Sequence, residues 1–282
     1  MKRARNRLWY LTVALATVLS LQLGFFLFTQ ISPSTFTSST SNYLHTGSTW
    51  NFEHKTTLIT NRTCAQYYFL LIVVSSAPAN LQRRNNIRKA WAFESVFKPR
   101  WTTVFLIAQT RLQTESSSLL KEDEVYGDLV RADYFDHYWN QTLKIQMGFE
   151  WATRYCKFSF LLKVDDDVFV NSAGVLSFLS EPSTPNEKLY VGEHRIKRGV
   201  HRAVTFVKAF SIVPFFRLDD VYVGMLAKKT GIKIIHNAGF ELNAPSRCIP
   251  HEGTLVRHGT LGDCLIEIFN RAANKLVKYT GV

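Results

Sequence analysis

The sequence predicts an α/β fold with a mainly parallel sheet, and two patterns carry that prediction. Continuous apolar runs rich in β-branched and aromatic residues indicate strands buried on both faces, at residues 67–74, 102–108 and 158–164. Polar stretches with helical spacing separate these runs, as Ile87 and Trp91 illustrate by standing four residues apart. Strands that alternate with helices are typical of a parallel sheet covered on both faces.

The remaining elements complete this alternation. Helices are expected in the intervening polar stretches, residues 79–93, 116–125 and 141–156. In the last of these, Leu143, Met147 and Trp151 share one helical face. A short strand is expected at residues 129–132. The helices then serve as the crossover connections that parallel strands require.

An uninterrupted apolar segment precedes the predicted fold. Residues 8–28 supply about the twenty residues that a helix needs to cross a hydrocarbon core, and Gln22 is their only strongly polar side chain. Basic residues cluster before the segment, so the positive-inside rule keeps residues 1–7 in the cytoplasm and translocates the rest. A cleaved signal peptide is the alternative, but the bulky end at Gly24–Phe28 is a poor cleavage context. We expect a retained transmembrane signal anchor.

A flexible stem is expected between the anchor and the folded part. Residues 29–63 are rich in Ser and Thr and lack periodicity, so they cannot bury enough apolar surface to fold. The folded luminal domain is expected to span residues 64–282. Two acceptor sequons, at Asn61 and Asn140, favour translocation and are candidate glycosylation sites.

The cysteine count and the net charge indicate which cellular compartment and which classes of binding partner suit the chain. The even set of four cysteines allows one or two disulfides without fixing the pairs, and no CxxC motif indicates zinc or redox chemistry. The net charge of +12 is compatible with nucleic acid, but the anchor and the absence of a nucleic-acid-binding motif exclude that partner. A basic surface facing anionic glycans or a diphosphate, and a solvated basic face with no partner, stay open.

Three consecutive carboxylates, Asp165, Asp166 and Asp167, directly follow the predicted strand at residues 158–164. Ligands of open α/β sheets bind beyond the carboxyl ends of the strands, where this turn would lie. Residues two apart in an extended segment project to the same side, so Asp165 and Asp167 are candidates for holding one hard divalent cation. Asp166 would point elsewhere or contact a ribose. A helix N-cap cluster or a simple acidic turn is the structural alternative.

A second acidic pair, Asp219 and Asp220, lies ahead of another helical stretch. A carboxylate beside a ligand can act as a general base that removes a proton from a hydroxyl group. The alternative is a pair of helix N-terminal residues stabilised by the helix dipole.

Six segments, in this order, resemble motifs of one family. They are Arg84–Trp91 (R-x-x-I-R-x-T-W, with Ala90 for Thr), Phe105–Ala108 (F-L-L-G), Glu124–Lys144 (E…Y-x-D…D-F-x-D-x-Y-x-N-L-T-x-K), Lys163–Asn171 (K-x-D-D-D-x-F-V-N), Asp219–Gly224 (E-D-V-Y-V-G, with Asp219 for Glu), and Cys248 with His258 (C…H). Together they resemble the β-1,3-glycosyltransferases of animal Golgi membranes, glycosyltransferase family 31, most closely the β-1,3-galactosyltransferase group. The resemblance runs from about Tyr67 to the C-terminus.

This resemblance implies a Rossmann-like GT-A domain in a single-pass type II Golgi membrane protein. The implied reaction is an inverting transfer of galactose or GlcNAc from a UDP-sugar to a glycoprotein or glycolipid glycan, in β-1,3 linkage, with Mn²⁺ or Mg²⁺. On that reading Asp167, helped by Asp165, holds the metal, and His258 is a candidate third ligand or phosphate contact, with a structural role as its alternative. Asp220 is the candidate general base, and Asp219 is the second choice.

The resemblance also implies contacts to the donor. Arg84, Arg88 and Lys163 are candidate diphosphate or nucleotide contacts, together with the neighbouring Asp165 and Asp166. Arginines of this first helix that only pair with surface carboxylates are the alternative.

One departure separates the chain from the family pattern. Between Gly192 and Asp219 the family carries a longer segment, whose loss is expected to affect the donor and acceptor pockets and to expose a sheet edge. Three hypotheses follow: an active transferase, a noncatalytic relative or short isoform that partners another glycosyltransferase, and a calcium-dependent lectin. The first is favoured, and association with itself or with other glycosyltransferases stays open.

Overall fold

The computed structural model describes residues 58–94, 98–185, 188–192, 200–201, 203–242 and 248–280. The expected cytoplasmic tail, transmembrane anchor and most of the stem lie outside these residues. Within the described ranges, no helix has both the length and the apolar character needed to cross a bilayer.

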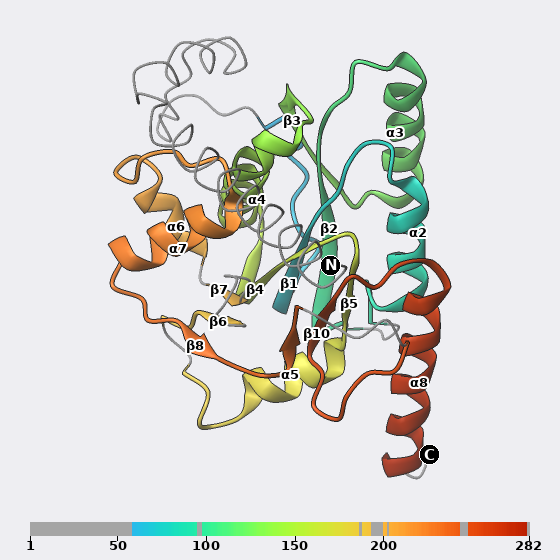
Figure 1. Cartoon of the computed structure of the whole chain (residues 1–282). Helices are drawn as coiled ribbons and strands as arrows, with labels where there is room; N and C mark the ends of the chain where they lie inside the picture. The colour runs from blue at the N-terminus through green and yellow to red at the C-terminus, as the bar shows by residue number, and fades with distance from the viewer. Residues whose placement is uncertain are drawn as a thin grey trace, which may run out of the picture. The chain divides into compact units, whose positions relative to one another are not determined.

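The described chain alternates strands and helices, as Figure 1 shows. In chain order the elements are β1 (Tyr67–Ser75), α2 (Leu81–Ala90), β2 (Trp101–Gln109), α3 (Gln113–Tyr126), β3 (Leu129–Phe135), the 3₁₀ helix η1 (Tyr138–Asn140), α4 (Gln141–Tyr155), β4 (Lys157–Asp165), β5 (Val168–Val170), α5 (Ser172–Ser180), β6 (Val191–Gly192), β7 (Val200–His201), α6 (Ala203–Ala209), α7 (Asp219–Lys229), β8 (Ile235–His236), β9 (Phe240–Glu241), β10 (Val256–His258) and α8 (Gly262–Thr280). Every strand and helix predicted between residues 67 and 164 is present, with boundaries shifted by a few residues.

The larger sheet confirms the predicted α/β class. Among the described residues it has seven strands in the order β3-β2-β1-β4-β7-β6-β8. Its centre is parallel, because β1 pairs with β2 and β4 and β2 pairs with β3 in the same direction. The short β7 runs antiparallel to both of its neighbours. A mainly parallel sheet of this kind fits a GT-A-like domain.

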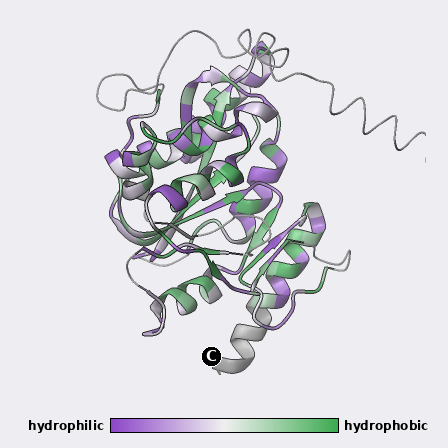
Figure 2. Ribbon diagram, turned by 60° about the vertical axis from the view of Figure 1, so that its left-hand side comes forward, coloured by the Kyte–Doolittle hydropathy of each residue, from purple (hydrophilic) through white to green (hydrophobic). Residues whose placement is uncertain are grey.

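Helices lie on both faces of this sheet (Figure 1). Helix α4 packs against β1, β2 and β3, and α6 and α7 pack against α4. On the other face α2 packs against α8. Strands β1 and β2 are largely apolar, and green segments mark apolar residues among the central ribbons of Figure 2. Residues 70–74 of β1 are fully buried, which is why this strand has a continuous apolar sequence rather than an alternating one.

Ordered contacts begin before Cys64, where the folded part was expected to start. Leu58 forms an antiparallel bridge with Ala132 of β3. Arg131 donates its backbone N–H to the Thr60 hydroxyl oxygen at 2.9 Å. A disulfide then joins Cys64 to Cys156 at the end of α4. The last residues assigned to the stem therefore run along the edge strand β3, because that edge offers backbone partners.

The interval between Gly192 and Asp219 supplies a strand to the sheet. Residues 200 and 201 form β7, which pairs with Leu161 and Leu162 of β4. The following helix α6 packs on α4, where Phe206 and Phe210 stack against Phe149. The expected exposure of the β4 edge is thus reduced, because a two-residue strand covers part of it.

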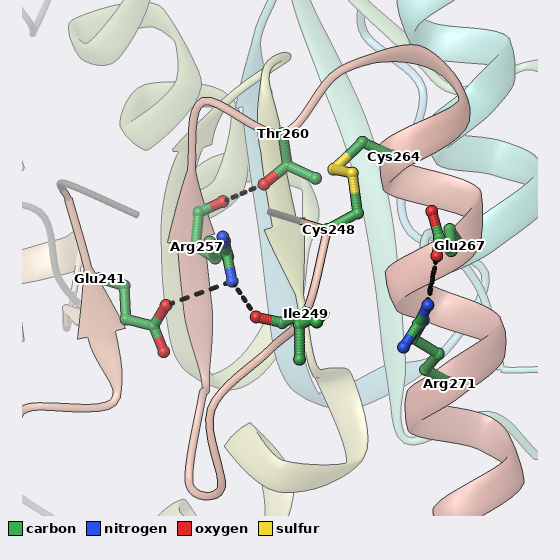
Figure 3. The surroundings of a disulfide bond; sticks show 8 residues. All are labelled: Glu241, Cys248, Ile249, Arg257, Thr260, Cys264, Glu267 and Arg271. Atoms are coloured by element: carbon green, nitrogen blue, oxygen red, sulfur yellow. Dashed lines mark hydrogen bonds and ion pairs between the residues drawn. A yellow bond between two sulfur atoms is a disulfide. The ribbon is translucent and has the colours of Figure 1, made fainter. Parts of the chain in front are cut away.

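A smaller sheet, β5-β10-β9, holds the C-terminal segment. Strand β10 runs antiparallel to β5, which follows the Asp165–Asp167 turn. A second disulfide, Cys248–Cys264, joins the segment before β10 to α8 (Figure 3). The buried Arg257 donates from Nη1 to the backbone oxygen of Ile249, as Figure 3 shows. The two disulfides agree with the expectation from the even number of cysteines, and they give the pairing that the spacing left open.

Candidate active site

A cavity of about 650 Å³ opens at the carboxyl ends of β1 and β4. It is lined by Ser75, Ser76, Ala77, Asn80, Arg83, Tyr138, Gln141, Lys144, Asp165, Asp166, Asp167, Leu218, Asp219, Asp220 and Val221. Ligands of open α/β sheets bind at this end of the strands. All five aspartates singled out from the sequence therefore reach one cavity.

The three candidate metal ligands lie together. Strand β4 ends at Asp165 and β5 begins at Val168, so the carboxylates occupy a tight turn between strands and not a helix N-cap. His258 comes from β10, where it pairs with Val168. One ligand atom each from Asp165, Asp167 and His258 all lie within 4.8 Å of one another.

These residues fit a divalent cation. Two carboxylate oxygens are the ligands that Mg²⁺ and Mn²⁺ prefer, and an imidazole nitrogen suits several transition metals. The His258 Nε2 atom lies 3.3 Å from the Asp167 Oδ2 atom. The three side chains are each partly exposed toward solvent, so an ion could reach them. The backbone bond from Thr260 N–H to the Asp167 carbonyl oxygen, at 2.7 Å, fixes the turn against β10.

Asp166 points away from this cluster, as the alternation along the turn predicts. Its carboxylate accepts hydrogen bonds from Ser76 at 2.7 Å, from Asn80 at 2.8 Å and from Arg83 at 2.9 Å. Asp166 is only 6% exposed. Asp166 therefore joins the loop between β1 and α2 to the acidic turn, and both segments line the cavity.

The second acidic pair lines the same cavity. Asp219 and Asp220 occupy the first turn of α7, where the helix dipole stabilises negative charge. Lys163 of β4 donates to Asp219 at 2.5 Å and to Asp165 at 2.9 Å, whereas its Nζ atom lies 4.0 Å from Asp220. Lys163 thus bridges the acidic turn and α7, and the described cavity lining does not include it.

A buried tyrosine lies close to this pair. Burial, and then the negative charge of Asp220, raise the pKa of Tyr190 well above its usual value, against a smaller effect of Lys163. Tyr190 is therefore a neutral phenol at physiological pH. It adds no negative charge to a wall that already holds two carboxylates.

The structure places Arg84 and Arg88 behind the cavity wall, which corrects their assignment as donor contacts. The Arg84 side chain is fully buried and binds both Glu122 carboxylate oxygens at 2.7 Å. It also donates to Ser76, to the Ala77 carbonyl at 2.6 Å and to the Pro78 carbonyl. Arg84 therefore shapes the loop between β1 and α2 from inside and is not free to bind a nucleotide.

Arg88 completes this buried network. It binds Asp128 through two bonds of 2.8 Å and Glu122 through one of 2.6 Å. Burial acts to lower the pKa of Arg88, but the bonds to Asp128 and Glu122 outweigh it and raise the pKa. Burial likewise acts to raise the pKa of Glu122, and the bonds to Arg84 and Arg88 outweigh it and lower the pKa. Two cations and two carboxylates neutralise one another, and these carboxylates are buried rather than on the surface.

Two cationic residues that the sequence reasoning did not assign do line the cavity. Arg83 is adjacent to Arg84 on α2, but its side chain is 41% exposed and reaches Asp166. Lys144 on α4 binds Asp136 at 2.9 Å and the Ser76 carbonyl at 2.9 Å. The helical period was the available signal for Arg83, because it sets Arg83 off the face that Arg84 and Ile87 share.

The two sequons differ in their surroundings. Asn61 is exposed. Asn140 is half-buried, and its side-chain nitrogen donates to the Phe135 carbonyl at 2.9 Å. Thr142 of the same sequon is fully buried and donates to the Phe216 carbonyl at 2.5 Å. The second sequon therefore has a structural part in joining α4 to the segment before α7.

Comparisons with known proteins agree with the motifs. Residues 82–208 match the family model described as Galactosyltransferase. The chain is 29% identical over 213 residues to beta-1,3-galactosyltransferase brn of Drosophila melanogaster, covering 63% of this chain and 65% of that protein. It is 31% identical over 226 residues to UDP-GlcNAc:betaGal beta-1,3-N-acetylglucosaminyltransferase 7 of Rattus norvegicus, covering 65% and 57%.

A third relative is beta-1,3-galactosyltransferase 1 of Homo sapiens, 27% identical over 207 residues, with 61% of this chain and 64% of that protein covered. The chain thus spans less than two thirds of the length of each of these relatives. The matched segment runs from α2 through the acidic turn to α6 and includes strands β2, β3 and β4 of the larger sheet. Through this segment the chain is similar to the galactosyltransferase family.

Proposed function

We propose that this chain is an inverting β-1,3-glycosyltransferase that moves galactose or GlcNAc from a UDP-sugar to a glycan acceptor. The relatives carry the names of transferases of both sugars. The observation that carries the proposal is the convergence of Asp165, Asp167 and His258 beside a cavity that Asp219 and Asp220 also line. A candidate site for one metal ion and a candidate base at the same cavity suit a single displacement at a sugar carbon.

Asp165, Asp167 and His258 would hold Mn²⁺ or Mg²⁺, which supplies charge neutralisation for the UDP leaving group. The protein contributes positions and fixed charges. Asp166, Asn80 and Arg83 hold the loop that would face the nucleotide, and the partly exposed Arg83 offers a cationic group to a diphosphate. Arg83 thus takes over the donor-contact role first given to Arg84 and Arg88.

Asp220 is the better general base. Asp219 accepts a bond from the Lys163 ammonium group at 2.5 Å, so one of its carboxylate oxygens is already engaged. Asp220 lies 4.0 Å from the same nitrogen and lines the cavity. Its carboxylate would accept the proton of the acceptor hydroxyl as that oxygen attacks the anomeric carbon and the bond to UDP breaks.

The wider setting follows from the sequence. The apolar segment at residues 8–28 and the basic residues before it support a single-pass type II anchor, with the folded domain in the Golgi lumen. The two disulfides suit an oxidising compartment. The acceptor is a glycoprotein or glycolipid glycan. Because the chain carries both the acidic turn and the Asp219–Asp220 pair at one cavity, we do not propose the noncatalytic alternative.

The decisive experiment measures UDP binding by calorimetry with Mn²⁺ and with chelator, and sugar transfer from UDP-galactose and UDP-GlcNAc to β-linked acceptors. Wild-type protein should bind UDP at least tenfold more tightly with Mn²⁺, and Asp167→Asn should remove that difference. Asp263→Asn is the matched control, because Asp263 is an exposed carboxylate at the start of α8. Equal UDP affinity with chelator and with Mn²⁺ would contradict the proposal.

A further inference from the structure

Exposed apolar side chains gather at one rim of the cavity. Tyr138 is 66% exposed, Trp139 46%, Phe216 42% and Leu218 40%. We call these four residues the rim patch. Large aromatic side chains are usually buried, and an exposed group of them beside a cavity marks a binding surface.

The rim patch is built from two segments that contact one another. Tyr138 and Trp139 belong to η1, and their rings meet edge to face with centroids 5.2 Å apart. The guanidinium of Arg217 lies 5.8 Å from the Trp139 ring centroid. The Thr142 hydroxyl binds the Phe216 carbonyl at 2.5 Å, which ties the start of α4 to the segment before α7. The aromatic rings are thus carried on a fixed backbone.

The position of the patch relates it to the general base. Tyr138 and Leu218 both line the cavity, and Leu218 directly precedes Asp219 and Asp220. A group lying on the Tyr138 and Trp139 rings would therefore reach the wall that holds the candidate base. The acceptor is the substrate whose hydroxyl must meet that base.

We propose that the rim patch is the platform on which the acceptor sugar ring packs, with Tyr138 and Trp139 as its main contacts. This inference rests on the proposed function. A pyranose ring has one face of C–H groups and an edge of hydroxyl groups. The C–H face packs on an aromatic ring, while the hydroxyls stay hydrated or reach polar side chains, and Tyr and Trp suit such mixed contacts. Gln141 lines the cavity beside Tyr138 and offers an amide to those hydroxyls.

The test compares Tyr138→Ala and Trp139→Ala with a matched control, Tyr67→Ala. Tyr67 is 54% exposed and begins β1, whereas the cavity lies at the other end of that strand. Three quantities are measured for each protein: the acceptor KM and kcat, the UDP affinity with Mn²⁺, and binding of methyl β-galactoside and methyl β-N-acetylglucosaminide by saturation-transfer NMR with UDP and Mn²⁺. The NMR measurement does not depend on turnover.

Each rim variant should raise the acceptor KM about tenfold, as expected for the loss of one well-packed aromatic contact. UDP affinity and the unfolding midpoint should match those of the control, because the removed side chains are exposed. Glycoside signals unchanged in both rim variants, or absent from the wild type, would overturn the inference. A loss of UDP affinity in Tyr138→Ala would also overturn it, since the ring would then serve the uridine. If the wild type binds glycosides but not UDP, that result contradicts the proposed donor site and still supports the rim patch as a sugar-binding surface.

Discussion

Replacing Glu122 by glutamine should destabilise the fold strongly, because Glu122 is the centre of the buried network behind the cavity. Its side chain is 2% exposed and accepts three bonds, two of 2.7 Å from Arg84 and one of 2.6 Å from Arg88. Glutamine has nearly the same shape, but it carries no charge and turns an N–H₂ group toward the guanidinium groups. Removing one partner of a buried ion pair costs about 3–5 kcal/mol, and we expect that loss in the free energy of unfolding.

The same substitution should change how stability depends on pH. The folded-state pKa of Glu122 lies below its ordinary value of 4.5, so its contribution is complete above pH 4.5. The contribution is lost as the pH falls from there through the folded-state pKa, because the unfolded chain then binds the proton more readily. The Glu122→Gln variant should therefore lose less unfolding free energy than the wild type as the pH falls below 4.5.

Urea denaturation followed by tryptophan fluorescence, at pH 7 and at intervals below pH 5, measures both effects. Glu124→Gln is the control, since Glu124 is an exposed residue of the same helix, and it should change the unfolding free energy by less than about 0.5 kcal/mol. Unfolding free energies within about 1 kcal/mol for the two variants at pH 7 would refute the reasoning, because a buried pair broken on one side costs more than that.

Three further predictions address the site, the disulfides and the sequons. Asp220→Asn should lower kcat about 10²–10⁴-fold while UDP affinity with Mn²⁺ is kept, and a larger loss of kcat in Asp219→Asn would exchange the two roles. Removing the Cys64–Cys156 disulfide, which closes a loop of 92 residues, should lower the free energy of unfolding by about 4–5 kcal/mol through chain entropy. Removing Cys248–Cys264, which closes a loop of 16 residues, should lower it by about 3 kcal/mol. Denaturation of the paired Cys→Ser variants measures both losses, and the reverse order would show that native contacts outweigh loop length. On secretory expression, Asn61→Gln should shift the electrophoretic mobility and Asn140→Gln should not, because the Asn140 amide is engaged in the folded chain; a shift for Asn140→Gln alone would contradict this.

Local sequence patterns were sufficient for the central sheet. The apolar run of β1 is long enough and uniform enough to have one interpretation, and the acidic turn follows directly from the end of β4. The partnership of Asp165 and Asp167 also follows from the chain geometry. His258 is different, because its place depends on the pairing of β10 with β5, which is a long-range contact. Only the family resemblance pointed to it.

The arginines of α2 show where the sequence reasoning went wrong. Arg84 is three residues before Ile87, and both lie on the buried face of the helix. A charged residue on that face needs a buried partner, and Glu122 is 38 residues away in the sequence. No local sequence pattern indicates an ion pair between residues so far apart in the chain. The positive charge that does reach the cavity comes from Arg83, one position along the helix, which the motif comparison passed over.

The pairing of β10 with β5 has a consequence for how the site is assembled during synthesis. A growing chain presents Asp165 and Asp167 long before the ribosome reaches His258, so the full ligand set cannot exist until the last strand emerges and docks. An ion bound by all three ligands favours the docked arrangement over the undocked one, in proportion to its free concentration and affinity. The supply of such an ion would then influence the yield of folded protein as well as its turnover.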